Sequence, residues 1–155
     1  MIVSRQRPAR RPGTSMVEFV LVATVFLLFL LGVLEYARLM FTMQLMNNAA
    51  REGARYAVVN AGTATTANVQ AYVNNFMAGQ GTKQLTGYTT GTNISVYMAD
   101  PTTATNTGLS WQNAGWGDAI GVTVSGTYKP IIPGFIYLAG NLSLTGSCVM
   151  TTEAN

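Results

Sequence analysis

The most regular hydrophobic feature of the chain is a long apolar stretch near its start. From position 20 to position 34 no residue is charged, and the apolar run extends back to Phe19. As a helix, residues 19–34 measure about 24 Å and residues 14–34 about 31 Å. A membrane hydrocarbon core is about 30 Å thick. The pattern therefore predicts a membrane-spanning helix over residues 14–34.

The helical pattern does not end where the membrane would end. Small and apolar residues continue at three- and four-residue spacing, and no proline interrupts them before position 101. Glu35 with Arg38, and Glu52 with Arg55, are i,i+3 pairs of the kind that supports an exposed helix surface. We expect one helix from about residue 15 to residue 58, whose second half packs outside the membrane.

A stripe of small residues follows the far end of this helix. Spacing by four places them on one face, where another element can approach the backbone closely. The stripe consists of Ala49, Ala50, Gly53, Ala54 and Ala57. Because glycine costs about 1 kcal/mol in a helix interior relative to alanine, Gly53 either ends or kinks the helix or permits close packing. We favour close packing against the chain's own sheet.

Residues 60–155 show shorter periodic segments. One group has helical spacing and predicts a short helix, capped by Thr65 or Thr66 and ended by Gly79. Its members are Val69, Tyr72, Val73, Phe76 and Met77. Residues 79–92 have loop composition. Three later runs, which begin at Ile94, Ile120 and Leu142, alternate apolar and polar residues as half-buried strands do.

These elements together predict an α+β fold. A small antiparallel sheet covering the outer half of the long helix is the economical arrangement. Two connections are unusual. Residues 100–118 contain Trp111 and Trp116, which either plug the loop onto the sheet or contact another subunit. The apolar loop over residues 129–140 packs on the core or lies against the membrane or a partner, and we favour the core.

Composition narrows the class of protein. The 155 residues make about one domain. Only 10% are charged, against about 25% in soluble domains. There is no histidine and one cysteine, so neither an intrachain disulfide nor a Cys/His metal site can form. No nucleophile–base pair or phosphate-binding glycine loop is evident. We therefore expect a membrane or assembly protein without a catalytic site, cofactor or small-molecule substrate.

The positive charge lies in the leader rather than in the outer domain. Arg5, Arg7, Arg10 and Arg11 precede the apolar run, whereas the residues from Asn60 onward carry a net charge of −1. Nucleic-acid binding would need a basic face on the folded domain, so we exclude it. Arginines on one side of an apolar segment orient that segment with the leader in the cytoplasm.

Glu18 is the one charged residue within residues 14–34. A carboxylate costs up to about 3 kcal/mol at the membrane midplane and less near an interface, so Glu18 either reaches the interface or pairs with a cation. Cleavage after Gly13 would give Thr14 an amino group four residues earlier, and a carboxylate could neutralise it. Pro12-Gly13 is expected to be extended, accessible backbone, with Thr14 or Ser15 capping the helix.

A cleaved secretory signal is the rival interpretation of this segment. Such a signal needs a small-x-small site after its apolar core. Here Gly32-Val33-Leu34-Glu35-Tyr36 follows instead, and the helical pattern continues. The junction at Gly13 is typical of a type IV pilin-like precursor.

Two stretches resemble the TadE-like family of pseudopilins, minor components of tight-adherence (Tad/Flp) pilus systems. The first is residues 11–19, Arg-Pro-Gly-Thr-Ser-Met-Val-Glu-Phe, with the apolar run that follows it. The second matches the family signature Asn-x-Ala-Arg-Glu-Gly-Ala-Arg through Asn48, Ala50, Arg51, Glu52, Gly53, Ala54 and Arg55. The two stretches lie in about the first third of the chain.

The resemblance implies a type IV pilin-like fold, and it implies that the protein is first cleaved and then assembled. A prepilin peptidase would cut between Gly13 and Thr14, and Glu18 would serve in processing and, with Phe19 in the helix packing, in assembly. The protein would lie in the bacterial cytoplasmic membrane with its C-terminal domain outside. Its partners would be the peptidase, other pilins and pseudopilins, the pilus assembly platform and membrane lipid.

The implied organisation has four parts: a leader (1–13) that is removed, a transmembrane half-helix (14–34), an outer half-helix (35–59) and a small α+β domain (60–155). The alternative is an uncleaved, single-pass anchor that presents a binding or adhesion module. Removal of residues 1–13 distinguishes the two.

Overall fold

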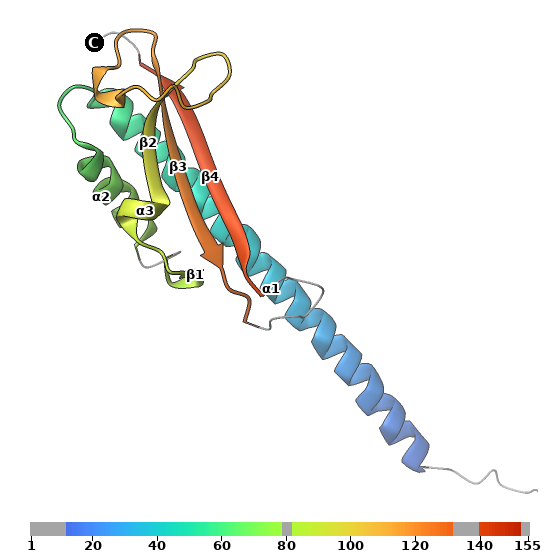
Figure 1. Ribbon diagram of the computed structural model, residues 1–155. Coiled ribbons are helices and arrows are strands. Elements are labelled where there is room, and N and C mark those ends of the chain that lie inside the picture. Colours follow the sequence, from blue (N-terminus) through green and yellow to red (C-terminus); the bar gives the residue numbers. More distant parts are fainter. Residues whose placement is uncertain (1–11, 79–81, 132–139, 153–155) are drawn as a thin grey trace, which may run out of the picture.

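The long N-terminal helix dominates the molecule. The computed structural model describes residues 12–78, 82–131 and 140–152. Helix α1 (Pro12–Val59) is 48 residues long and runs without interruption from the apolar segment into the outer domain (Figure 1). Pro12 opens the helix at a position where its missing N–H costs no hydrogen bond. The expected continuous helix is confirmed.

The outer domain adds short helices and a sheet. The short helix α2 begins after Thr65, whose side chain accepts a hydrogen bond from the backbone N–H of Asn68, so the expected cap is confirmed at Thr65. In chain order the elements are α2 (Thr66–Met77), η1 (Thr82–Gln84), β1 (Leu85–Thr86), α3 (Thr90–Asn93), β2 (Ile94–Ala99), η2 (Trp111–Asn113), β3 (Ala119–Tyr128) and β4 (Leu142–Thr151).

The sheet is antiparallel, and β3 lies at its centre. Strand β4 pairs with one edge of β3 along its whole length, while β2 and the short β1 pair with the other edge. Val122 is opposite Val96 on β2 and opposite Cys148 on β4. The three strands expected from alternation are all present, and the α+β fold class is confirmed.

The core lies between this sheet and the helices. Helix α1 packs along β3 and β4, and α2 packs beside α1 and β2. Ile120, Val122 and Val124 on β3 are fully buried, whereas Thr123 and Ser125 between them are only half buried. The alternation seen in the sequence therefore separates the packed face of the sheet from the more accessible one.

Two glycines allow other elements to approach closely, Gly53 on α1 and Gly146 on β4. A Cβ on Gly53 would lie 2.4 Å from Val73 Cγ2 and 3.2 Å from Val122 Cγ1. A Cβ on Gly146 of β4 would lie 2.7–2.9 Å from backbone atoms of Met46 and Asn47. The close-packing interpretation of Gly53 is confirmed, and the helix does not end there.

The prediction of a loop over residues 79–92 is wrong in part. Within its described residues the segment contains η1, β1 and the start of α3. Leu85 is buried, and its side chain fills the space above Gly126 on β3. A strand of two residues is too short to show alternation in the sequence. Strand β1 is therefore recognisable only from its contacts in the folded protein. The expected stop at Gly79 lies outside the described residues.

Candidate functional site

The first part of α1 exposes a continuous apolar surface. It contains a stretch long and apolar enough to cross a membrane, and no other helix among the described residues does. The side chain of Phe19 is 71% exposed and that of Phe29 is 70% exposed. The same surface is formed by Met16, Val17, Val20, Leu21, Val22, Val25, Phe26, Leu27, Leu28, Leu30, Leu31, Val33 and Leu34. Such a surface needs lipid or other helices as its environment.

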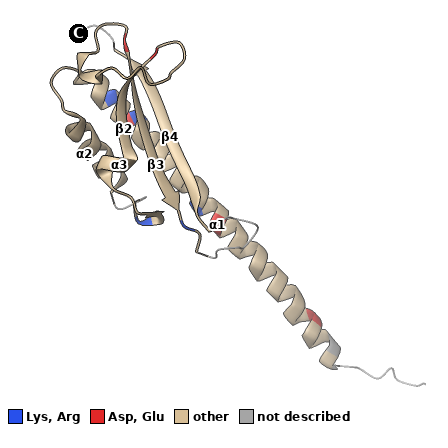
Figure 2. Cartoon of the chain, viewed as in Figure 1, with Lys and Arg blue, Asp and Glu red and all other residues tan. Residues whose placement is uncertain are grey.

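The residues expected to serve in processing lie at the start of α1. Gly13 is exposed, and among the described residues no neighbour lies within 4 Å of the position that a Cβ would take there. Glu18 is also exposed, and it makes no ion pair within the described part of the chain. Figure 2 shows a red, acidic segment near the described beginning of α1, with no blue segment next to it. The backbone of Thr14 belongs to the same helix, and the structure does not describe its side chain.

Two local expectations at this junction are wrong. Pro12 and Gly13 are helical rather than extended, and Thr14 and Ser15 are therefore inside the helix rather than capping it. The reason is that proline is well suited to the first turn of a helix. The accessibility expected at Gly13 is present nevertheless.

The carboxylate of Glu35 marks the place where α1 enters the outer domain. Its Oε1 accepts a hydrogen bond from the Tyr128 hydroxyl at 2.7 Å and another from the Ile131 N–H at 3.2 Å. Its Oε2 lies 3.6 Å from Arg38 Nη1. The residue is only 5% exposed. The i,i+3 pair exists, but the prediction of an exposed pair is wrong, because the end of β3 covers Glu35.

Tyr128 completes this junction from the sheet. Its side chain is fully buried, and the Arg38 guanidinium lies 5.7 Å from its ring centroid, within cation–π distance. Burial raises the pKa of Tyr128 to about 12, and its hydrogen bond to Glu35 contributes in the same direction. Tyr128 is therefore a protonated donor near neutral pH, and it ties β3 to α1.

The family-signature residues divide between two faces of α1. Ala50, Gly53 and Ala54 are buried against the core, whereas Asn48, Arg51 and Arg55 are exposed and Glu52 is half buried. The Nε and Nη2 groups of Arg55 donate to Glu52 Oε2 at 3.2 and 3.0 Å. This pair raises the pKa of Arg55 above its ordinary value. The expected exposed pair is confirmed here.

A small pocket lies beside this charged face. It has a volume of about 150 Å³ and is lined by Arg55, Tyr56, Val59, Asn60 and Tyr72. The rings of Tyr56 and Tyr72 stack with centroids 4.6 Å apart and an interplanar angle of 13°. The sequence does not indicate this pocket, because its two tyrosines come from separate helices and the spacing of Tyr72 indicates only the apolar face of α2.

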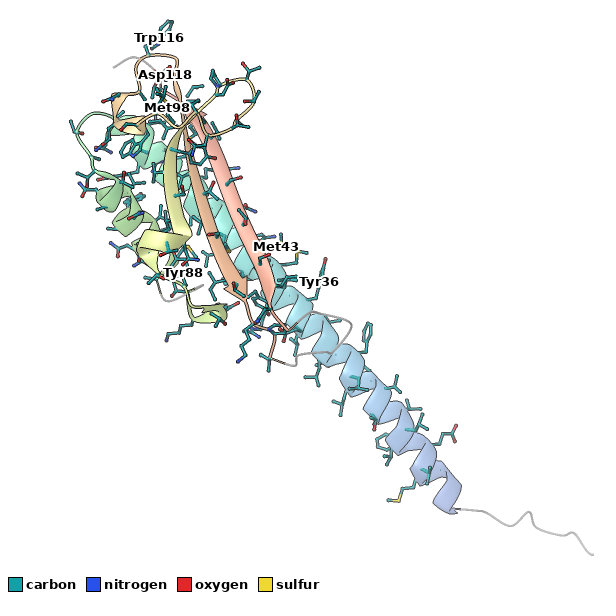
Figure 3. The ribbon with its side chains drawn as sticks, viewed as in Figure 1. Tyr36, Met43, Tyr88, Met98, Trp116 and Asp118 are labelled. Atoms are coloured by element: carbon teal, nitrogen blue, oxygen red, sulfur yellow. The ribbon has the colours of Figure 1, made fainter. Side chains whose placement is uncertain are left out.

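The two tryptophans of residues 100–118 have different environments. Trp111 is 3% exposed, and its Nε1 donates to Thr66 Oγ1 at 2.9 Å. Trp116 is 81% exposed, at the end of the molecule remote from the start of α1 (Figure 3). The interpretation that both plug the loop onto the sheet is confirmed for Trp111 and wrong for Trp116. Of the apolar loop, residues 132–139 lie outside the described residues.

The acidic and sulfur side chains of the described residues do not form a metal-binding group. In the described ranges, no three or more His, Cys, Asp or Glu residues lie together as a metal ion requires. Cys148 is a free, half-buried thiol on β4. The functional features of the described structure are therefore surfaces: the exposed apolar helix, its junction with the domain, and the pocket at its outer end.

The fold and these surfaces define a class: an α+β protein whose long N-terminal helix has an exposed apolar segment that can anchor it in a membrane. Residues 13–55 match the family model described as TadE-like protein. No curated protein and no solved structure matches the chain. The match confirms the resemblance that the sequence shows over residues 13–55. It covers the exposed helix, the junction residue Glu35 and the signature.

Proposed function

We propose that this protein is a minor pilin, or pseudopilin, of a Tad pilus system, which is cut by a prepilin peptidase and acts in pilus assembly or adhesion. One observation carries the proposal. Helix α1 runs unbroken from Gly13 through an exposed apolar segment into the outer domain, and Glu18 is the only charge in that segment. The TadE-like match begins at residue 13.

Processing would change the electrostatics of the helix start. Cleavage after Gly13 places a new ammonium group on Thr14, about 6 Å along the helix axis from Glu18. The helix dipole disfavours a positive charge there. A carboxylate of the same or a neighbouring subunit would offset that cost, and it would itself gain a partner in a medium of low dielectric constant. We therefore propose that Glu18, by pairing with this ammonium group, fixes the position of one subunit relative to the next.

Assembly would proceed through the exposed apolar helix. In lipid, helices associate by van der Waals packing rather than by a hydrophobic driving force, and Phe19 offers a large side chain, 71% exposed, beside Glu18. The hydrogen bond between Glu35 and Tyr128 joins helix and sheet, so movement of the helix would carry the outer domain with it. The partners are the peptidase, other pilins and pseudopilins, the assembly platform and membrane lipid.

The proposed location follows from the same division of the chain. Residues 14–34 would cross the cytoplasmic membrane once, with the leader of residues 1–13 on the cytoplasmic side. Residues 35–59 and the domain of residues 60–155 would lie outside the cytoplasm, where the protein can enter the filament.

Substitution of Glu18 tests the assembly step. We expect Glu18→Ala to lower the number of pili per cell at least about tenfold, because the new amino terminus loses its partner. Thr24→Ala is the matched control, since it removes a polar group from the same exposed apolar segment without removing a charge. Normal piliation in the Glu18→Ala strain, with the protein present at its usual level, would contradict the proposal.

An uncleaved anchor that presents a binding module is the second candidate function. Trp116 favours it, because this side chain is held outward on a well-connected turn. Asp118 Oδ2 accepts from the Gly115 N–H at 2.7 Å, and the Thr152 N–H donates to the Asp118 carbonyl at 2.7 Å. This function requires that residues 1–13 remain on the protein.

A further inference from the structure

The pocket at the outer end of α1 combines a rigid wall with an available positive charge. We propose that it is a docking site for an acidic segment of a second protein, in which one carboxylate of that segment pairs with Arg55. The inference goes beyond the proposed function, because it concerns a site far from the processed terminus and the apolar helix.

The walls of the pocket are already in place. The stacked rings of Tyr56 and Tyr72 connect α1 to α2 and form one side. Asn60 is held at the helix end by its Nδ2, which donates to the Tyr56 carbonyl at 2.8 Å. Val59 is 67% exposed at the pocket. A site that needs no rearrangement loses less free energy to ordering when a partner binds.

Glu52 orients the Arg55 guanidinium but leaves part of it accessible to a partner. Its Nε and Nη2 both donate to the same oxygen, Glu52 Oε2. In addition to Glu52, the neighbouring Tyr72 side chain contributes to raising the pKa of Arg55, yet the Arg55 side chain remains 66% exposed. A guanidinium carries five N–H donors, so it can hold Glu52 and receive a second carboxylate at the pocket.

The local charge favours an acidic partner. Arg51 is exposed one turn before Arg55, and no ion pair to it occurs in the described ranges. Arg51, Glu52 and Arg55 therefore leave this face with a net charge of +1. Elsewhere the described residues from 60 onward carry two lysines and two aspartates, which balance. Complementary charge fixes the register of an interface and excludes wrong partners.

The position and size of the pocket favour a protein over a lipid or a nucleic acid. If the membrane ends near Leu34, Arg55 lies about 32 Å further along the helix, which is beyond the headgroup layer. A single net charge is too little for binding to a phosphate backbone. A cavity of about 150 Å³ accepts a group the size of benzene, which is the size of one side chain.

The test places a photoreactive benzophenone amino acid at Val59 of the full-length protein in its own host. Illumination should give one defined adduct, and mass spectrometry should locate it within a few residues of an Asp or Glu of the partner. Arg55→Gln should lower the adduct yield at least about tenfold. Lys83→Gln is the matched control, since it removes an exposed cation away from the pocket, and it should leave the yield unchanged.

A charge exchange completes the test. Arg55→Glu should abolish the adduct, and replacement of the partner's acidic residue by arginine should restore it. The proposal is overturned by no adduct at Val59, by an adduct in a segment without acidic residues, by a yield that Arg55→Gln leaves unchanged, or by a failed exchange. Removal of residues 1–13, read from the mass of the same samples, reports on processing independently of the pocket.

Discussion

The three carboxylates of α1 differ in how exposed they are and in the partners they contact. Glu18 is exposed on the apolar segment, Glu52 forms an exposed pair with Arg55, and Glu35 is buried under the end of β3. Within the part of the chain that the structure describes, Glu35 alone among the three receives hydrogen bonds from outside α1. We therefore expect its loss to affect folding, whereas the loss of Glu52 should have little effect on stability.

Glu35→Ala should destabilise the outer domain by about 1–3 kcal/mol, because the buried Tyr128 hydroxyl and the Ile131 N–H lose their acceptor. Denaturant unfolding of the full-length protein in detergent measures this, with the fluorescence of the buried Trp111 as the signal in a Trp116→Phe background. Glu52→Ala, which breaks an exposed pair, should cost no more than about 0.5 kcal/mol. Equal losses in the two variants would show that the Glu35 junction does not stabilise the fold.

The raised pKa of Tyr128 should make the contact between Tyr128 and Glu35 lose stability at high pH. Its value of about 12 in the folded protein is above the ordinary value of 10.0. The folded state therefore holds this proton more tightly than the unfolded state. The resulting stabilisation is complete below pH 10 and is lost as the pH rises toward about 12. The stability advantage of the wild type over Tyr128→Phe should shrink across that interval. An advantage independent of pH would contradict the account.

At the scale of elements, the fold depends on how closely α1 approaches its neighbours. Gly53 meets Val73 of α2 and Val122 of β3, and Gly146 of β4 meets the backbone of α1. The two contacts differ in kind. Side chains face Gly53, so a substitution there can be compensated, whereas backbone atoms face Gly146 and cannot be trimmed.

Gly53→Ala should destabilise the protein by about 1–3 kcal/mol through overpacking, although alanine favours a helix by about 1 kcal/mol. Adding Val73→Ala should recover part of the loss, and a double-mutant cycle measures the coupling. Gly146→Ala combined with Val73→Ala is the control in which no recovery is expected. Additive effects of Gly53→Ala and Val73→Ala would mean that the two residues do not compete for the same space.

The sequence predicts the long elements of this fold well and its contacts less well. Helices α1 and α2 and the three longer strands are each long enough to show their periodicity. Strand β1 has two residues and no period to detect. The burial of Glu35 depends on Tyr128, 93 positions later in the chain, and the pocket depends on Tyr56 meeting Tyr72. These features arise only when distant segments come together, so local patterns cannot indicate them.

At the scale of the whole molecule, α1 combines an exposed apolar segment, long enough to cross a membrane, with the core of a small domain. Its first part has no cover among the described residues beyond a few positions such as Gly32, while its second part lies against β3, β4 and α2. On the proposed function, lipid covers this apolar helix surface before assembly and other helices cover it afterwards. The assignment of residues 14–34 to the membrane and of residues 35–59 to the outside stays a prediction.

The intact mass of the protein extracted from membranes tests the central claim most directly. It should be measured with and without the prepilin peptidase, for the wild type and for Gly13→Val, which places a branched side chain at the proposed cleavage site. The account predicts that residues 1–13 are missing only when both the peptidase and Gly13 are present. A full-length chain in every sample would contradict it and would leave an uncleaved membrane anchor that presents a binding domain.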